Sequence, residues 1–184
     1  DLFDRLKAEV RVFHAEPNGS NINDGCGATS PEFIAKHAGG RIGLAFDGDA
    51  DRLIAVDEAG NVANGDVIMA IIARHLKEQG RLTKNLVVAT VMSNLGFRKS
   101  MEQAGIELVE TPVGDRYVME ALLERKALLG GEQSGHIIFA DIAQTGSGFF
   151  AGVTGSVGTT GRRRASSCRR RKSSQSASNS AHEV

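Results

Sequence analysis

Residues 41–57 of the sequence are RIGLAFDGDADRLIAVD, and this stretch decides the predicted fold. Two short apolar runs of strand length flank an acidic loop. Asp47, Asp49 and Asp51 occupy alternate positions of that loop, so a tight turn between two strands brings their carboxylates towards one point. Three close negative charges repel one another, and a hard divalent cation with oxygen ligands relieves the conflict. The stretch therefore predicts a strand, a metal-binding loop and a second strand.

A calcium-binding EF-hand loop is an alternative for the same acids, because five residues match its positions 1, 3, 5, 8 and 12: Asp47, Asp49, Asp51, Ile54 and Glu58. Position 6 of that loop requires Gly for a sharp turn, whereas this chain has Arg52 there. The apolar flanks also favour strands over the helices of an EF-hand. An acidic turn that only faces water is a further alternative. Arg52 favours a phosphate site, since its guanidinium can bind phosphate oxygens beside a metal ion.

Apolar runs of strand type alternate with amphipathic helical stretches through the first 150 residues, which is typical of an α/β protein. The predicted strands cover residues 8–15, 41–47, 52–57, 85–92 and 106–113, and the predicted helices cover residues 66–79, 95–104 and 116–126. Residues 58–61 predict a hairpin turn, near which we place a boundary between two partial α/β lobes, residues 1–58 and 59–150. We expect mixed, largely parallel sheets in these lobes.

Composition excludes several classes of protein. With 184 residues and 41% hydrophobic residues, the chain has the composition of a soluble globular protein, and it contains no apolar run approaching the roughly 20 residues of a membrane-spanning helix. Its first residues also lack a signal-peptide pattern, which predicts a cytoplasmic protein that does not bind membranes. Cys26 and Cys168 are far apart and belong to no cluster, so neither a disulfide framework nor a zinc site is indicated.

The net charge of zero hides a basic tail. Residues 162–172 carry seven of the 22 Lys and Arg residues, so residues 1–161 keep 15 basic against 21 acidic residues. An acidic body argues against nucleic-acid binding. Residues 151–184 have almost no large apolar side chains, which predicts a disordered tail rich in Ser and Arg. We interpret the abrupt change in composition as out-of-frame translation, and the alternative is a basic tail for nucleic acid or acidic membranes.

A second candidate site is the loop GGEQSGH, residues 130–136. Glu132 can accept hydrogen bonds from two adjacent sugar hydroxyls, Ser134 can donate or accept one, and the glycines let the backbone approach a ligand. His136 is a candidate proton carrier or a structural hydrogen-bonding group. The segment TPVGDRYVME, residues 111–120, supplies three further candidates for substrate binding: Gly114, Asp115 and Arg116. Asp115 can alternatively cap the helix that follows, with Arg116 exposed to water.

The order of these segments resembles the α-D-phosphohexomutase superfamily, and within it the phosphoglucosamine mutase family. The resemblance covers about residues 1–148 and is carried by EPNGSNINDGCGATSPE, GLAFDGDADRLIAVD, NGDVIMAIIA, VMSNLGF, PVGDRYVMEAL, GGEQSGHIIF and a final TG. It implies the end of the second and most of the third of four domains. It also implies an isomerase that interconverts glucosamine 6-phosphate and glucosamine 1-phosphate through a phosphoserine and a bisphosphate intermediate, on the route to UDP-N-acetylglucosamine.

The resemblance implies a role for each candidate residue. The residues that would hold one Mg²⁺ ion are Asp47, Asp49 and Asp51. The residues that would bind the hexosamine phosphate substrate are Glu132, Ser134, Gly114, Asp115 and Arg116. Two more would take part in catalysis, because Arg52 would contact the transferring phosphoryl group or the sugar and His136 would transfer a proton.

The chain also departs from the pattern of this family. It has no Ser-His-Asn-Pro type stretch for the phosphoserine and no Arg-x-Ser-Gly-Thr type loop for the substrate phosphate, and Ser147 stands where the family usually has Asp. We therefore expect a fragment without turnover of its own, whose partners are domains 1 and 4 of a parent enzyme. The alternatives are a phosphomannomutase or phosphoglucomutase, and a non-catalytic module that binds a metal ion or a phosphosugar.

Overall fold

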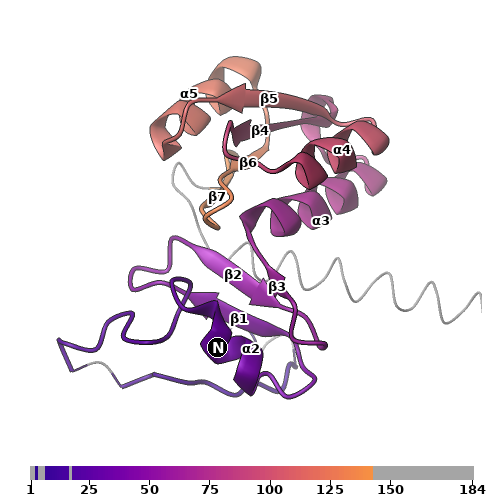
Figure 1. Ribbon diagram of the computed structural model, residues 1–184. Helices are drawn as coiled ribbons and strands as arrows, with labels where there is room; N and C mark the ends of the chain where they lie inside the picture. The colour runs from indigo at the N-terminus through magenta and orange to yellow at the C-terminus, as the bar shows by residue number, and fades with distance from the viewer. Residues whose placement is uncertain (1–2, 4–6, 17, 143–184) are drawn as a thin grey trace, which may run out of the picture.

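The computed structural model of the chain describes residue 3, residues 7–16 and residues 18–142 (Figure 1). The helices are α2 (Pro31–His37), α3 (Gly65–Glu78), the short 3-10 helix η1 (Thr83–Asn85), α4 (Leu95–Gln103) and α5 (Asp115–Arg125). The strands are β1 (Gly43–Phe46), β2 (Leu53–Val56), β3 (Val62–Ala63), β4 (Leu86–Thr90), β5 (Glu107–Thr111), β6 (Leu129–Gly131) and β7 (Ile137–Phe139). The predicted tail at residues 151–184, Ser147 and Cys168 lie outside the described residues.

The strands form two sheets, one in each half of the described chain (Figure 1). β1, β2 and β3 are antiparallel neighbours in that order, with Gly43 opposite Val56 and Val56 opposite Val62. The second sheet has the order β5-β4-β6-β7, in which β4 pairs in parallel with β5 and β6, and β7 pairs antiparallel with β6. The predicted mixed α/β class is confirmed, and parallel pairing is found in the second sheet. The expectation of largely parallel sheets in both lobes is wrong, because β1, β2 and β3 follow one another through short turns, which join antiparallel strands, and β7 also pairs antiparallel.

Alternating side chains of β4 divide the second half of the protein into three layers. All five residues of this strand are buried, and successive side chains point to opposite faces. Val87 and Ala89 pack in one cluster with the buried residues of α3 and α4. Leu86 and Val88 pack in a second cluster with Val118 and Leu122 of α5, as expected for helices on both faces of a parallel sheet.

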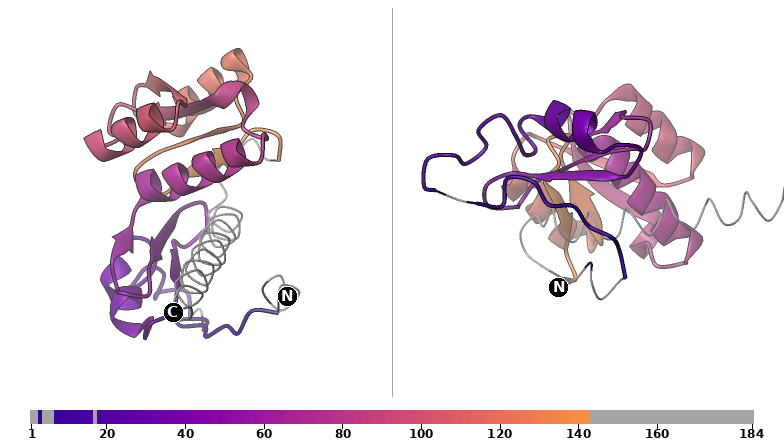
Figure 2. Two further views of the ribbon diagram at one scale, coloured as in Figure 1. Left: turned by 90° about the vertical axis from the view of Figure 1, so that its right-hand side faces the viewer. Right: turned by 90° about the horizontal axis from the view of Figure 1, so that it is seen from below.

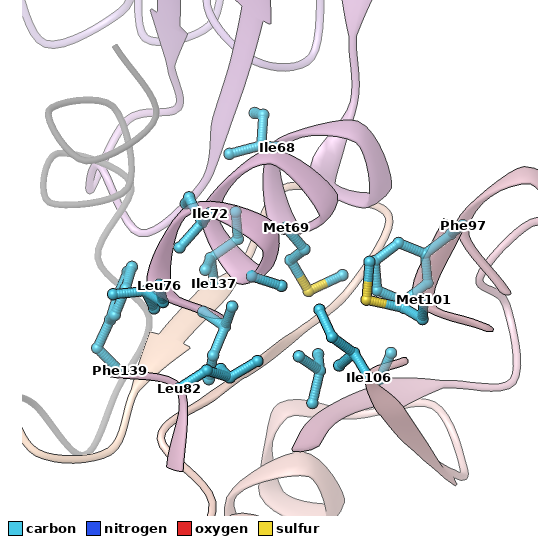
Figure 3. Packing of buried hydrophobic residues seen from close by; sticks show 14 of the residues in the cluster. Ile68, Met69, Ile72, Leu76, Leu82, Phe97, Met101, Ile106, Ile137 and Phe139 are labelled. Carbon is cyan, nitrogen blue, oxygen red and sulfur yellow. The ribbon is translucent and has the colours of Figure 1, made fainter. Parts of the chain in front are cut away.

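Helix α3 joins the two halves, because it lies between the two sheets (Figure 2). Its buried apolar side chains recur at helical spacing and are Ile68, Met69, Ile72, Ala73 and Leu76. Figure 3 shows Met69 beside the α4 side chains Phe97 and Met101, with Ile137 of β7 next to Ile72. Leu53 of β2 belongs to the same cluster, and four partly buried residues of the first sheet pack against it: Leu44, Phe46, Ala55 and Ala63. One core therefore serves both halves.

Local signals explain where α3 and α4 begin. The side chain of Asn64 caps α3 by accepting a hydrogen bond from Val67 N at 3.2 Å, and Asn94 caps α4 by accepting from Phe97 N at 2.9 Å. Caps of this kind are worth about 1 kcal/mol each. The three predicted helices and the strands predicted at residues 41–47, 52–57, 85–92 and 106–113 all correspond to observed elements. The sequence pattern was therefore sufficient for these elements.

The strand predicted at residues 8–15 is wrong, because this segment forms no strand and is mostly exposed. A strand is stable only when its backbone groups pair with a neighbouring strand, and no described segment pairs with this one. A side-chain contact with α2 is made instead, because the rings of Phe13 and Phe33 meet edge to face at 5.7 Å. Within the segment the guanidinium of Arg11 lies 5.2 Å from the centre of the Phe13 ring.

The domain boundary near residue 58 stays a prediction. The strand pairing places residues beyond that position in the first sheet. β3 follows that position and pairs with β2, so Val62–Ala63 belongs to the first sheet. We propose that the boundary falls between β3 and α3.

In the described part of the chain no helix is long and apolar enough to span a lipid bilayer. Cys26 is buried with a free thiol.

Asp57 organises the predicted hairpin turn between β2 and β3. Its Oδ1 accepts hydrogen bonds from Ala59 N at 2.9 Å and Asn61 N at 2.8 Å, and its Oδ2 accepts from Asn61 Nδ2 at 2.9 Å. These bonds favour the charged carboxylate, and the bond from the Asn61 side chain contributes most to lowering the pKa of Asp57 below its ordinary value.

The depressed pKa of Asp57 predicts a contribution to stability that depends on pH. Because the folded state favours the charged form, the contribution is present above the ordinary Asp pKa of about 3.9 and is lost as the pH falls through the lower pKa of the folded state. We expect Asp57→Asn to be less stable than wild type at pH 7, with a difference that shrinks below about pH 4. Urea unfolding at a series of pH values measures it. A difference that stayed constant down to pH 2 would contradict the prediction.

Candidate functional site

The turn between β1 and β2 brings the three predicted metal ligands together. Ala50 adopts left-handed φ at 59° and its N donates to Asp47 O at 3.1 Å, while Arg52 N donates to Asp47 Oδ1 at 3.1 Å. One carboxylate oxygen from each of Asp47, Asp49 and Asp51 lies within 4.8 Å of the other two. Oxygens bound to one hard cation at about 2.0–2.6 Å lie roughly 3–5 Å apart, so the set fits such an ion. The flanking elements are strands, which rules out the EF-hand alternative.

The acidic cluster is electrostatically unfavourable without a cation. Burial raises the pKa of Asp51 above its ordinary value, and the hydrogen bond and charge of Asp47 and the charge of Asp49 raise it further. The charge of His136 acts in the opposite direction. A bound cation would favour the charged form of all three carboxylates.

Arg52 extends its side chain along the acidic cluster. Its Nε lies 3.8 Å from Asp47 Oδ2 and 3.9 Å from Asp51 Oδ1, and 47% of the side chain is exposed. At these distances and this exposure the guanidinium partly compensates the negative charge without being committed to either carboxylate. Its remaining N–H donors can therefore reach a phosphate next to the acids.

Three contacts join the acidic turn to the loop between β6 and β7. Arg52 and His136 form an isolated antiparallel bridge, and Leu53 N donates to Gly135 O at 3.0 Å. His136 Nδ1 lies 3.0 Å from Asp51 Oδ2, with the His136 side chain buried. Gly135 has φ of 97°, and a Cβ there would lie 2.3 Å from Leu53 O, so only glycine permits this approach. The two motifs predicted from sequence thus form one site.

The carboxylate of Glu132 lies at the beginning of α5. Glu132 Oε1 accepts a hydrogen bond from Gly114 N at 3.0 Å, and Ser134 Oγ lies 3.4 Å from Glu132 Oε2. Gly114 is the N-cap residue of α5, so the positive end of the helix dipole stabilises the negative charge of Glu132. The structure therefore brings together three of the predicted substrate-binding residues: Gly114, Glu132 and Ser134.

The other two predicted substrate-binding residues have local contacts. Asp115 is the first residue of α5, and its Oδ1 accepts from Arg116 N at 2.7 Å. The N-cap is Gly114, so the alternative in which Asp115 caps the helix is wrong. Arg116 Nε bonds Glu120 Oε1 at 2.8 Å on the exposed face of α5. Within residues 18–142, neither side chain forms a hydrogen bond with Glu132 or Ser134.

Sequence reasoning missed a buried carboxylate beside this site. Asp66, 1% exposed in the first turn of α3, accepts from Ser93 Oγ at 2.9 Å and from Asn94 N at 2.8 Å. The preceding residue, Gly65, donates its N–H to Gln133 O at 2.9 Å. The strand pattern offered a signal for this contact, because loops at the carboxyl ends of neighbouring parallel strands meet at one edge of a sheet. Ser93 follows β4 and Gln133 follows β6, and these two strands pair in parallel.

Comparison with known proteins agrees with this architecture. Residues 64–156 match the family model described as phosphoglucomutase/phosphomannomutase, alpha/beta/alpha domain III. The description corresponds to the three layers formed by α3 and α4, the second sheet, and α5. The chain belongs to the phosphoglucomutase/phosphomannomutase family.

Within that family the chain is similar to enzymes named phosphoglucosamine mutase. It is 56% identical over 155 residues to the enzyme of Bacillus licheniformis and 56% identical over 155 residues to that of Geobacillus thermodenitrificans. The matches cover 83% of this chain but 35% of each relative, so the chain spans about a third of their length. A crystal structure of a phosphoglucomutase/phosphomannomutase family protein from Burkholderia thailandensis superposes with a TM-score of 0.70 at 25% identity, covering 82% of this chain and 34% of that one.

The convergent carboxylates predict saturable binding of Mg²⁺ by the 184-residue chain. Asp49 is the exposed member, and Asp49→Asn removes one charged ligand with little change in shape. We expect this variant to bind Mg²⁺ at least about tenfold more weakly in calorimetric titration, because charged oxygen ligands govern affinity for hard cations. It should also unfold at a higher temperature than wild type in EDTA, since it removes one repelling charge.

Glu124→Gln is the matched control, because Glu124 is an exposed acid on α5 that lies outside the acidic cluster. It should leave Mg²⁺ affinity unchanged. Equal affinity of wild type and Asp49→Asn, in chains with the same circular dichroism spectrum, would contradict the metal assignment.

Proposed function

We propose that this chain supplies the metal-binding and sugar-binding part of a phosphoglucosamine mutase, an isomerase that interconverts glucosamine 6-phosphate and glucosamine 1-phosphate. The observation that carries the proposal is the junction at which Asp51 of the acidic turn contacts His136 of the Glu132 loop. A phosphosugar needs both kinds of group within one small site. Oxygen ligands for a cation serve its phosphate, and a carboxylate with a hydroxyl serves its sugar ring.

The acidic turn would hold one Mg²⁺ ion. The convergence of Asp47, Asp49 and Asp51 within 4.8 Å supports this role, as does the raised pKa of Asp51. When bound, the ion would offset negative charge on the phosphoryl group that is transferred. Arg52, half exposed beside the acids, would donate hydrogen bonds to the oxygens of that group.

The loop of Glu132 would bind the sugar. Glu132 Oε1 is engaged by Gly114 N, and its second oxygen can accept from sugar hydroxyls while Ser134 Oγ donates or accepts. His136 holds Asp51 through Nδ1, which supports a role in orienting that ligand, and its imidazole is also the candidate for proton transfer near the reacting oxygen. Asp115 and Arg116, at the start of α5, remain predicted substrate contacts.

Glucosamine phosphates are favoured over mannose or glucose phosphates, because the curated relatives that are 53–57% identical are named phosphoglucosamine mutase. The same names favour an enzyme over a non-catalytic binding module. Because the chain spans about a third of those relatives, the phosphoserine and a loop for the substrate phosphate would come from other parts of a parent enzyme, predicted as domains 1 and 4. A cytoplasmic location also stays a prediction.

A chimeric enzyme tests the proposal. The matching segment of Bacillus licheniformis phosphoglucosamine mutase is replaced by its counterpart from this chain, and conversion of glucosamine 6-phosphate is measured with Mg²⁺ present. We expect turnover, and we expect Glu132→Gln to reduce kcat/KM roughly 10- to 100-fold, since it loses a charged acceptor while its amide oxygen can keep the bond from Gly114.

Glu124→Gln in the same chimera is the control and should leave kcat/KM unchanged. A folded chimera that converts mannose or glucose phosphates but not glucosamine phosphates would overturn the assigned substrate. A folded chimera inactive on all of them would overturn the mutase proposal.

A further inference from the structure

The beginning of α3 packs against the backbone of the loop that carries Glu132. Gly65, the first residue of α3, donates its N–H to Gln133 O at 2.9 Å. A Cβ at Gly65 would lie 2.1 Å from Glu132 O, 2.7 Å from Gly135 N and 2.9 Å from Gln133 O. Real Cβ atoms are essentially never found this close to backbone atoms, so any side chain at position 65 must displace the loop or the helix.

Asp66 anchors the first turn of the helix, so a side chain at position 65 is expected to displace the loop. This carboxylate is 1% exposed, and the bonds from Ser93 Oγ and Asn94 N tie it to the turn between β4 and α4. A buried carboxylate is tolerated only when it is hydrogen-bonded, and a position in the first turn of a helix adds favourable interaction with the helix dipole. The next turn of α3 is fixed by Ile68 and Met69, which are buried in the core.

We infer that Gly65 and Asp66 are positioning residues that set the place of the Glu132 loop relative to the acidic turn. Gly65 permits the close contact between the start of α3 and the backbone of the Glu132 loop, and Asp66 fixes the position of that helix end. The same loop bonds the acidic turn on its other side through Leu53 N and Gly135 O. The loop is therefore held from two sides, and displacement by a methyl group at position 65 would be transmitted to Glu132 and to the His136–Asp51 contact. Its effect on turnover rests on the proposed function, whereas the loop position does not.

Amide hydrogen exchange of the 184-residue chain, measured residue by residue by NMR, tests the positioning directly. The reporters are the N–H groups of Glu132, Gly135 and Leu53, which donate to His136 O, Glu132 O and Gly135 O. We expect Gly65→Ala to lower the protection of these amides by about tenfold or more, while amides in the core of β4 keep theirs relative to the global stability.

Gly80→Ala is the matched control. Gly80 has φ of 67° and open space around its Cβ position, so alanine there is strained without touching the loop. It should lower overall stability and leave the three reporters protected to the same degree relative to the core. Loss of reporter protection in both variants alike, or in neither, would overturn the inference.

Asp66→Asn supplies the second variant if Gly65→Ala fails to fold, since it keeps the shape and removes the charge. We expect it to deprotect the reporters of the Glu132 loop together with the turn at residues 91–94, whereas Ser93→Ala, which removes one of the two bonds, should affect the turn more than the loop. Deprotection confined to residues 91–94 in Asp66→Asn would overturn the role of Asp66.

The chimeric mutase separates this inference from the proposed function. With the loop displaced, Gly65→Ala should lower kcat/KM for glucosamine 6-phosphate roughly 100-fold, because misplacing a binding group by about 1 Å costs about that much. Gly80→Ala should retain the parent value at a temperature where both are folded. If exchange changes and the unsubstituted chimera is inactive, the function proposal fails and the positioning stands. If the chimera is active and Gly65→Ala leaves its kcat/KM unchanged, the positioning role fails.

Discussion

The candidate site depends on one close backbone junction between two sheets that share no strand. Leu53 N donates to Gly135 O, and beside this bond His136 Nδ1 lies 3.0 Å from Asp51 Oδ2. The groups proposed to hold the cation and the sugar therefore come from loops 85 residues apart in sequence. Because the junction is made largely by main-chain atoms, its geometry is fixed more rigidly than long side chains could fix it.

The junction also concentrates unfavourable electrostatics at one point. Three carboxylates converge there, and burial with the neighbouring acids raises the pKa of Asp51. Arg52 and His136 offset only part of this charge. The shared core around α3 supplies the compensating stability, because each fully buried aliphatic side chain in it contributes about 1.5–3 kcal/mol. A cation that bound these carboxylates would relieve their repulsion and so stabilise the folded state.

Local sequence patterns predicted the elements but not the contacts between them. The helical spacing of Ile68, Ile72 and Leu76 located α3, and the acids at alternate positions located the acidic turn. The segment at residues 8–15 has a strand-like pattern yet forms no strand, since pairing requires a partner that no local pattern specifies. Asp66 and Ser93 meet across 27 positions, and only the order of the strands reveals that contact. Whether a segment pairs as a strand and which distant residues meet therefore depend on long-range packing, which local propensity does not encode.

Two kinds of residue build this site, and they act through different physics. Glu132 and Asp49 supply charge and hydrogen-bonding groups, so isosteric changes there alter chemistry while the backbone stays in place. Gly65 and Gly135 supply no chemistry, but the absence of a Cβ lets α3, β2 and the Glu132 loop meet at contact distance. Different positions therefore set the backbone geometry of the site and supply its charged and hydrogen-bonding groups. The glycines of GGEQSGH and NGD matter to the proposed binding as much as the acids do, because moving the backbone displaces every functional group attached to it.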